Sequence, residues 1–345
     1  MINTVYYQDL TKMNTFGMKV TARCFIEYDS VADLVDIEFE ELARPVLHIG
    51  GGSNLLFTDD FKGTVLHSKI DFIEILQDGP EVLVSVGSGV AFDDFCAWAA
   101  KEGLWGVENL SYIPGEVGAS AVQNIGAYGV EVKDVIRKVY CYDTVEEEFV
   151  SFGVEECEYG YRDSIFKDPE VKGRYIVTHV VFALSREPRP RLDYGHLRDA
   201  ISADHANAIT PALIRKTIIM IRKEKLPDPS VKGSAGSFFK NPVISAEHFA
   251  KIEAAARAEH GSDCKVPHYD LPDGMVKVPA AWMIEQCGWK GRRSGGAAVW
   301  EKQPLVIVNI TGEAYPEEII GLEKRIVASI KAKFDVELHP EVEHI

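Results

Sequence analysis

The chain has 345 residues, of which 46% are hydrophobic and 26% are charged, and its formal net charge at pH 7 is −16. This length exceeds that of one simple core and favours two or three domains. Because binding to nucleic-acid phosphates needs a basic surface, the acidic balance argues against a general nucleic-acid-binding protein. No window reaches the apolar length of a membrane span, and residues 1–12 lack the apolar core of a signal peptide, so we expect a cytoplasmic protein with no membrane partner.

The cysteine pattern argues against a disulfide framework and against a zinc site. The six cysteines are scattered and form no C-x-x-C pair, which is typical of reduced thiols. Near the end of the sequence, His339, Glu341 and His344 are residue types that bind metals, but their spacing gives no compact ligand set. We therefore expect no metal.

Helical and strand patterns alternate along the first half of the chain. Ser30 with Asp33 gives a capping-box-like helix start, and Gly103 is placed to end a later helix. The predicted elements are helices over 30–42 and 92–102 and strands over 45–49, 65–76, 82–86, 135–142 and 175–184.

A proline-rich, charged stretch over 187–191 follows the last of these strands and indicates a domain boundary. We therefore expect one domain over 15–186 and a second over 187–345, whose final strand, 336–345, could return to the N-terminal lobe. The elements predicted beyond the boundary are helices over 210–222, 245–259, 279–286 and 316–334 and a strand over 305–310.

Two glycine-rich stretches suggest a cofactor site. Residues 50–54, Gly-Gly-Gly-Ser-Asn, follow a predicted strand and could point N–H groups at a phosphate, although a bare turn would need no ligand. They match neither a Walker loop nor the dinucleotide glycine fingerprint. Residues 115–129 combine four glycines with small or apolar neighbours, which suggests backbone lying flat against a large planar group; tight internal turns are the alternative.

Residues 233–242 carry a candidate proton donor. Ser237 follows a flexible glycine-containing run and precedes two phenylalanines able to exclude water, although a glycine turn into a buried strand would have the same pattern. Arg162 lies among tyrosines, where its guanidinium could bind a carboxylate or simply form a surface ion pair with Asp163.

Several sequence blocks in order resemble the UDP-N-acetylenolpyruvoylglucosamine reductase family, flavoenzymes of bacterial peptidoglycan synthesis. The resemblance covers essentially the whole chain. The form with a tyrosine loop is indicated by Tyr194. The blocks are Asn14–Gly17, Gly50–Asn54, Ile113–Gly115, Gln123–Gly129, Gly160–Ser164, Leu226–Pro229, Gly236–Pro242 and His339–Val342.

The resemblance implies an α+β protein: a PCMH-type FAD-binding fold of two α+β lobes plus a C-terminal α+β substrate-binding domain. It implies FAD as cofactor, NADPH as hydride donor, UDP-N-acetylenolpyruvoylglucosamine as substrate and a monomeric state. The residues it assigns to FAD are Gly50, Gly51, Gly52, Ser53, Asn54, Ile113, Pro114, Gly115, Gly118, Ala119, Ser120, Asn124, Ile125, Gly126, Tyr128 and Arg162. Those it assigns to the substrate are Tyr194, Lys225, Asn241, Tyr269 and Gln303.

The resemblance also implies catalytic roles. Ser237 would deliver a proton to the substrate, while Arg162 and Glu341 would stabilise an enolic intermediate. Glu116 is a departure, because small or neutral residues are more usual beside the flavin loop. Two other functions stay open: a flavin oxidase or dehydrogenase of the same fold, and a nucleotide-sugar-binding regulator without catalysis. Flavin content and turnover would distinguish the three.

Overall fold

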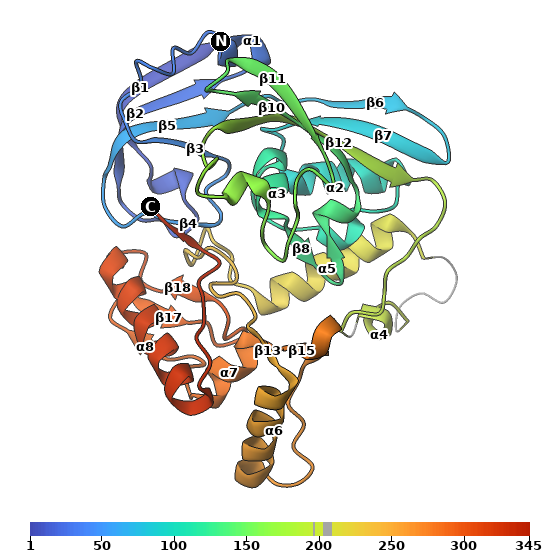
Figure 1. The fold of residues 1–345 in the computed structure, drawn as a ribbon, viewed down its shortest axis with the longest axis vertical. Helices are drawn as coiled ribbons and strands as arrows, with labels where there is room; N and C mark the ends of the chain where they lie inside the picture. Colours follow the sequence, from blue (N-terminus) through green and yellow to red (C-terminus); the bar gives the residue numbers. More distant parts are fainter. Residues whose placement is uncertain (196, 203–208) are drawn as a thin grey trace. The chain divides into compact units, whose positions relative to one another are not determined.

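The computed structural model describes residues 1–195, 197–202 and 209–345 (Figure 1). These residues form two compact units. The N-terminal unit comprises Met1–Met13, Lys19–Gly52 and Asp60–Glu224, and the C-terminal unit comprises Asn14–Met18, Ser53–Asp59 and Lys225–Ile345. Two short early segments of the chain are therefore built into the C-terminal unit.

The N-terminal unit contains the long strands of the protein. Its strands are β1 (Ile2–Asp9), β2 (Thr21–Tyr28), β3 (Val46–Ile49), β5 (Phe61–Ser68), β6 (Ile73–Gln77), β7 (Glu81–Gly87), β8 (Gly126–Ala127), β9 (Val130–Glu131), β10 (Ile136–Asp143), β11 (Glu148–Gly153) and β12 (Tyr175–Ser185). Its helices are α1 (Val31–Val35), α2 (Phe92–Lys101), α3 (Val117–Gln123), α4 (Leu197–Ser202) and α5 (Pro211–Lys225), the last residue of which already belongs to the C-terminal unit.

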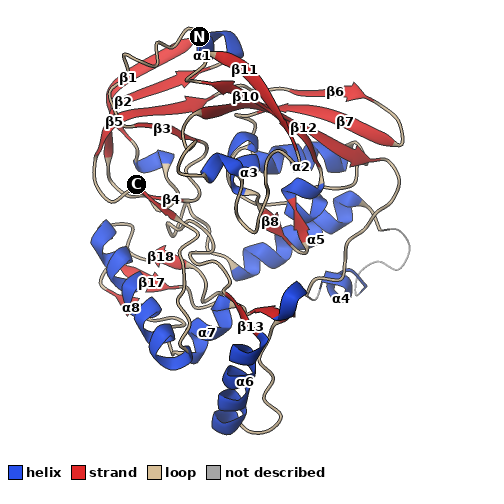
Figure 2. Ribbon diagram, in the orientation of Figure 1, coloured by secondary structure: helices blue, strands red, loops and turns tan. Residues whose placement is uncertain are grey.

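Two sheets organise this unit (Figure 2). In the first, of order β1-β2-β5-β3, β1 is antiparallel to β2, and β2, β5 and β3 run parallel. The second is antiparallel, with the order β11-β10-β12-β7-β6. Helices α2 and α3 contribute Phe95 and Ala121 to the apolar cluster that also buries Phe182 of β12. Helices α2 and α3 thus pack on the second sheet, and their ends are held at fixed positions.

The predicted helix over 30–42 is shorter than expected. Ser30 caps α1 as predicted, with the backbone N–H of Asp33 donating to its hydroxyl at 3.1 Å, but the helix ends at Val35. Beyond it, Phe39 enters the same core cluster as Leu34. A continued helix would turn these two side chains to different faces, so packing of Phe39 favours a turn over more helix.

One other expectation for this half needs correction. The apolar run 65–76 is not one strand, because it crosses from β5 of the first sheet to β6 of the second. For the glycine-rich stretch 115–129 no helix was predicted, and α3 lies inside it. Small residues such as Gly118 fit both a loop and a closely packed short helix, and the sequence pattern did not separate the two.

The compact unit extends beyond the boundary expected at 186/187. Residues 187–224 group with the N-terminal unit. The reason is apolar packing: Leu192, Ile214 and Ile218 form a buried cluster with Trp105, which follows α2. The proline-rich stretch at 187–191 is thus a connection within this unit, and the contacts place the division after Glu224.

The C-terminal unit combines short strands with three helices. Its strands are β4 (Leu55–Leu56), β13 (Val243–Ser245), β14 (Tyr269–Asp270), β15 (Met275–Lys277), β16 (Arg293–Ser294), β17 (Ala297–Val299), β18 (Ile307–Asn309) and β19 (Glu343–His344), and its helices are α6 (Ala246–His260), α7 (Ala280–Gln286) and α8 (Pro316–Phe334). The sheets have the orders β13-β15-β14 and β16-β17-β18, and β19 pairs in parallel with β4. The end of the chain therefore pairs with the early segment 55–56, which is grouped with the C-terminal unit.

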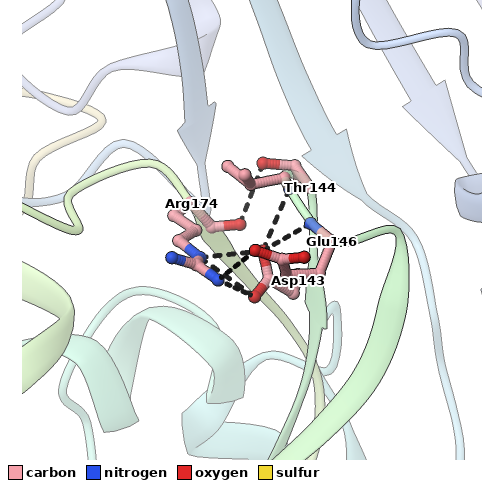
Figure 3. Close-up of polar contacts among 5 residues, drawn as sticks. Asp143, Thr144, Glu146 and Arg174 are labelled. Atoms are coloured by element: carbon pink, nitrogen blue, oxygen red, sulfur yellow. Dashed lines mark hydrogen bonds and ion pairs between the residues drawn. The ribbon is translucent and has the colours of Figure 1, made fainter.

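One ion pair fixes the turn after β10 (Figure 3). Arg174 Nη2 donates to Asp143 Oδ2 at 2.6 Å and Arg174 Nε donates to both carboxylate oxygens at 2.9 Å. The Thr144 hydroxyl donates to the carbonyl oxygen of Arg174 at 3.0 Å. Burial alone would raise the pKa of Asp143, but Arg174 and the N–H groups of Val145 and Glu146 outweigh it and hold that pKa below its usual 3.8.

Candidate active site

The first glycine turn begins at the carboxyl end of β3. Gly52 has a φ of 61°, a conformation that glycine adopts without strain. A Cβ atom on Gly51 would lie 3.4 Å from the Cα of Gly115, and one on Gly50 would lie 3.0 Å from the Cβ of Ala119. The structure thus brings the turn at 50–52 against the second glycine-rich stretch, which lies far away in sequence.

The second stretch is anchored through its backbone. Gly115 O accepts a hydrogen bond from Phe92 N at 2.9 Å, and Gly118 N donates to Ser88 O at 3.0 Å. A Cβ atom on Gly118 would lie 2.8 Å from the Cβ of Ser88, so this glycine is required by packing alone. Ser120 is also used internally, since its hydroxyl donates to Val117 O at 2.7 Å.

Arg162 is held against the end of this stretch. It lies in the turn closed by the Gly160 N to Asp163 O hydrogen bond of 3.1 Å, and its φ is 57°. Its Nη2 donates to Gly126 O at 2.6 Å and its Nη1 to Asn124 O at 3.3 Å. Asn124 ends α3 with a φ of 45° and donates its own amide to Gly160 O at 2.7 Å. The guanidinium is therefore fixed at the segment 124–126.

The remaining residues assigned to FAD lie around the same segment. Ile113 packs against the apolar cluster under α3 and precedes Pro114 and Gly115. Ile125 N donates to Ser120 O at 3.2 Å. The structure brings together the assigned residues of the N-terminal unit, while Ser53 and Asn54 are grouped with the C-terminal unit.

Tyr194, assigned to the substrate, lies beside the FAD stretch rather than apart from it. Its ring makes an edge contact with the ring of Tyr128, with centroids 6.2 Å apart. A Cβ atom on Gly129 would lie 3.3 Å from the Cβ of Tyr194. Burial raises the pKa of Tyr128, so this phenol stays neutral at physiological pH.

Arg222 is a nearby cation whose position the sequence did not indicate. Its Nε donates to Tyr112 O at 3.1 Å. Its guanidinium interacts favourably with Tyr128, while burial lowers the pKa of Arg222 from its usual value. At the end of a helix, a basic residue is usually a partner of the helix dipole. Only the packing of α5 shows that this one faces the glycine-rich stretch.

In the C-terminal unit, the segments of Ser237 and Glu341 lie side by side. Glu341 N donates to Phe238 O at 2.8 Å, and Phe239 forms an antiparallel bridge with Pro340. On its other side, Ser237 forms a bridge with Val306. Both phenylalanines are fully buried, whereas Ser237 and Glu341 are half-buried. Ser237 and Glu341 are therefore partly exposed residues beside two buried phenylalanines.

Asn54 joins this arrangement through Glu341. The Asn54 amide donates to Glu341 O at 3.1 Å, and Asn54 O accepts from Glu343 N at 2.9 Å. Thr58 continues the pairing, because its hydroxyl donates to Ile345 O at 2.7 Å. The early segment 53–59 thus braces the segment 341–345, in which Glu341 lies two residues before β19.

The residues assigned to the substrate in the C-terminal unit are spread over several elements. Gln303 precedes the Leu305–Val306 segment that pairs with Ser237 and Phe238, and its Oε1 accepts from Leu305 N at 3.4 Å. Asn241 Oδ1 accepts from Ala280 N at 2.9 Å and so caps α7. Lys225 is exposed at the end of α5, and Tyr269 lies on β14 at the edge of its sheet, with Lys277 Nζ 5.6 Å from its ring centroid.

Neither a metal centre nor a membrane-spanning helix is found within 1–195, 197–202 and 209–345. No cluster of three His, Cys, Asp or Glu side chains in these ranges could hold a metal ion. None of their helices combines the length and the apolar character needed to cross a bilayer. All six cysteines are free thiols.

The glycine-rich region of the N-terminal unit fits a flavin nucleotide. The backbones of Gly51 and Gly115 approach each other without side chains between them. Glycine backbone of this kind can present N–H groups to a phosphate or a peptide plane to a flat ring. Arg162 adds a fixed cation at the end of the same stretch. Residues 50–52, 113–128 and 162 are those that would hold FAD.

Comparisons with known proteins agree with this fit. Residues 22–149 match the family model "FAD binding domain", and residues 228–345 match "UDP-N-acetylenolpyruvoylglucosamine reductase, C-terminal domain". The chain is 49% identical over 338 residues to UDP-N-acetylenolpyruvoylglucosamine reductase of Bacteroides fragilis (strain YCH46), covering 97% of this chain and 98% of the relative. It is 46% identical over 342 residues to the enzyme of that name from Porphyromonas gingivalis (strain ATCC 33277), covering 97% of each chain.

A solved structure confirms the expected fold class. The crystal structure of UDP-N-acetylenolpyruvylglucosamine reductase from Thermus caldophilus superposes with a TM-score of 0.67 at 22% identity, covering 100% of this chain and 98% of that chain. Together with the two family models, it confirms a PCMH-type FAD-binding α+β fold. The glycine-rich stretches 50–54 and 115–129 thus lie within the FAD-binding domain.

Proposed function

The chain belongs to the UDP-N-acetylenolpyruvoylglucosamine reductase family of FAD-dependent oxidoreductases, and we propose that it reduces the enolpyruvyl ether of UDP-N-acetylglucosamine to UDP-N-acetylmuramic acid in bacterial peptidoglycan synthesis. NADPH is the proposed hydride donor. When bound, FAD would accept that hydride and pass it to the terminal vinyl carbon of the substrate. A monomeric state and a cytoplasmic location complete the proposal.

Hydride addition creates negative charge that the protein must stabilise. The electron pair of the double bond moves onto the carbon beside the substrate carboxylate and is delocalised into that carboxylate. A preorganised cation is the strongest means of stabilising such charge, and Arg162 is proposed for this role. Its hydrogen bonds to Asn124 O and Gly126 O support the proposal, because they hold the guanidinium in place before the reaction.

Ser237 is the proposed proton donor to the same carbon. Its O–H bond breaks as the new C–H bond forms, and the serine then recovers a proton from solvent. A hydroxyl is a weak acid in water, so this role needs a position fixed beside the reacting carbon. The pairing of Glu341 N with Phe238 O at 2.8 Å is the observation that carries the proposal, because it joins the backbone segment of Ser237 to that of Glu341. Glu341, when protonated, would donate a hydrogen bond to the enolic intermediate.

Five residues are proposed to contact the uridine-diphosphate part of the substrate. These are Tyr194, Lys225, Asn241, Tyr269 and Gln303. Tyr194 and Lys225 are well suited, since both side chains are exposed. Asn241 already caps α7 through its Oδ1, so its amide nitrogen is the part available to a ligand.

An anaerobic two-step flavin titration tests this function. Purified holoenzyme is first bleached with NADPH and then mixed with UDP-N-acetylenolpyruvoylglucosamine, while the visible flavin absorption is followed. We expect bleaching, then rapid return of colour on adding the substrate. Recovery only on admitting oxygen would instead support a flavin oxidase. Protein that binds substrate but shows no flavin, even after reconstitution with FAD, would support a binding regulator. NADH in place of NADPH tests the donor, and gel filtration tests the monomeric state.

A further inference from the structure

A buried histidine lies between two carboxylates beneath the first glycine turn. His67, on β5, places Nδ1 3.0 Å from Glu27 Oε1 and Nε2 2.9 Å from Glu116 Oε1. The His67 side chain is 5% exposed, and those of Glu27 and Glu116 are 28% and 15% exposed. The three side chains form a continuous polar chain, Glu27–His67–Glu116, from β2 to the start of α3.

With both flanking carboxylates ionised, this geometry calls for two protons on the imidazole ring. A neutral imidazole has one N–H group, so it can donate to only one of two flanking carboxylates and would present a lone pair to the other. An imidazolium donates to both. Burial opposes that charge, but Glu116 and Glu27 outweigh it and raise the pKa of His67 above its usual value.

The other titratable neighbours of His67 are neutral groups. His48 on β3 forms a 2.8 Å hydrogen bond with the hydroxyl of Tyr28. Burial and the charge on His67 lower the pKa of His48 to about 3, so it is an uncharged acceptor. Burial raises the pKa of Tyr28, which keeps its phenol protonated. The two carboxylates are therefore the charges that face His67 from the packed elements.

Glu116 connects this chain to the region assigned to FAD. It is the residue immediately before α3, between Gly115 and the helix. Its Oε2 lies 3.3 Å from the position that a Cβ atom on Gly50 would occupy. A carboxylate here without a counter-ion would repel a diphosphate bound to the turn at 50–52. The neighbouring imidazolium, which Glu116 shares with Glu27, offsets part of that charge and holds Glu116 Oε1 by a hydrogen bond.

We propose that His67 is a positioning residue for FAD binding: as an imidazolium it holds Glu116 against β5 and offsets part of its negative charge beside the Gly50–Gly52 turn. The inference rests on the proposed assignment of that turn to FAD. It follows that FAD affinity falls as pH rises through the pKa of His67, because the released Glu116 carboxylate then faces the diphosphate unpaired.

The test measures FAD binding to apoprotein by quenching of flavin fluorescence between pH 6 and pH 9. For the wild type we expect Kd to rise with pH. His67→Gln should raise Kd at pH 6.5 about tenfold and flatten the pH profile, since about 1.4 kcal/mol corresponds to tenfold. Glu116→Gln should also flatten the profile but bind FAD at least as well as the wild type at pH 9. The double variant, His67→Gln with Glu116→Gln, should have a Kd for FAD within about threefold of that of Glu116→Gln.

A control and a second readout separate this role from a merely structural one. His179→Gln removes another partly buried histidine, whose ring stacks on Tyr140 at 4.3 Å, and should leave the profile unchanged. An NMR titration of the apoprotein should give His67 a pKa above the usual histidine value of 6.5. In Glu116→Gln the pKa of His67 should be lower than in the wild type. That measurement is independent of whether FAD binds.

Several outcomes would overturn the inference. It is wrong if His67→Gln weakens FAD binding equally with Glu116 and with Gln at position 116, because the loss is then structural. It is also wrong if His67 titrates below 6.5, or if Glu116→Gln keeps the wild-type pH profile; these last two tests stand even if His67→Gln fails to fold. Apoprotein that binds no FAD at any pH while His67 titrates as expected would refute the proposed cofactor assignment rather than the imidazolium itself.

Discussion

The two candidate regions are held in place by different means. In the N-terminal unit, glycine backbones pack against each other and a guanidinium binds main-chain carbonyls at 124–126. In the C-terminal unit, Ser237 and Glu341 project from segments paired by main-chain hydrogen bonds. The first region leaves little room for a side chain at Gly50 and Gly118. The second depends on strand register and should tolerate changes to single side chains. Removing a functional group from the second should therefore change chemistry without changing cofactor binding.

The largest expected effect comes from removing the Ser237 hydroxyl. Ser237→Ala should slow reoxidation of reduced flavin by substrate about 10²–10⁴-fold, the usual contribution of a general acid, and leave flavin reduction by NADPH unchanged. Stopped-flow absorbance of the two half-reactions measures this. Ser234→Ala in the same loop is the control and should affect neither. Equal loss in both half-reactions would remove the distinction between the regions.

Replacing Arg162 should affect both cofactor site and chemistry. Arg162→Lys keeps a charge but cannot bind two carbonyl oxygens in the same fork, so we expect turnover to fall about 10²–10³-fold. Since the guanidinium also supports the 124–126 segment, FAD affinity should fall as well. Steady-state kinetics at saturating FAD and a flavin-binding titration separate the two losses. The matched control is Arg257→Lys, because Arg257 forms an ion pair with Glu253 on α6, away from the candidate site residues.

An added methyl group tests the sensitivity of the glycine contact. Gly51→Ala would place a Cβ atom 3.4 Å from Gly115 Cα, at van der Waals contact, so the added methyl group would fill the space between the two loops. We expect FAD to bind about tenfold more weakly, a change of about 1.4 kcal/mol, with a folded protein. Gly79→Ala, where the nearest atom would be 3.6 Å away, should bind FAD like the wild type. Unchanged affinity in Gly51→Ala would mean that the close approach is not needed for the cofactor.

The smallest effect is expected at a pair that belongs to neither region. Asp143→Asn should cost about 1 kcal/mol of unfolding free energy at pH 7, by weakening the pair with Arg174. Because Asp143 has a lowered pKa when folded, its contribution is complete above 3.8 and is lost as pH falls through the folded value. The difference from wild type should therefore vanish in acid. Denaturant titrations at several pH values measure it, and Glu146→Gln, the outer partner at 3.5 Å, should matter less.

Sequence patterns predicted the helices and strands well where one packing surface determines the element. The helix over 316–334 matches α8 in full, because its apolar face is continuous. The pattern failed where a segment changes sheets, as between β5 and β6, since apolar periodicity does not record which sheet a strand joins. Strands β1 and β2 were not predicted, although β2 carries Glu27.

The candidate site was predicted as a set of residues but not as a set of contacts. Glycine density indicated that 50–54 and 115–129 approach something closely, and the structure brings these stretches into contact with each other. Glu116 stood out only as a departure from the family pattern. Its partner His67 could not be found from the sequence, because strand pairing and the packing of α3, rather than spacing, bring them together.

The parallel pairing of β4 with β19 has a consequence for the order of folding. The hydrogen bonds that hold Asn54 and Thr58 join residues 287 positions apart. During translation, the segment 53–59 leaves the ribosome long before its partners exist, so this part of the C-terminal unit can form only after residues 341–345 have been synthesised. Contacts of such long range close late and slowly. The segment 341–345, which includes Glu341, is therefore expected to be among the last parts of the protein to gain its native structure.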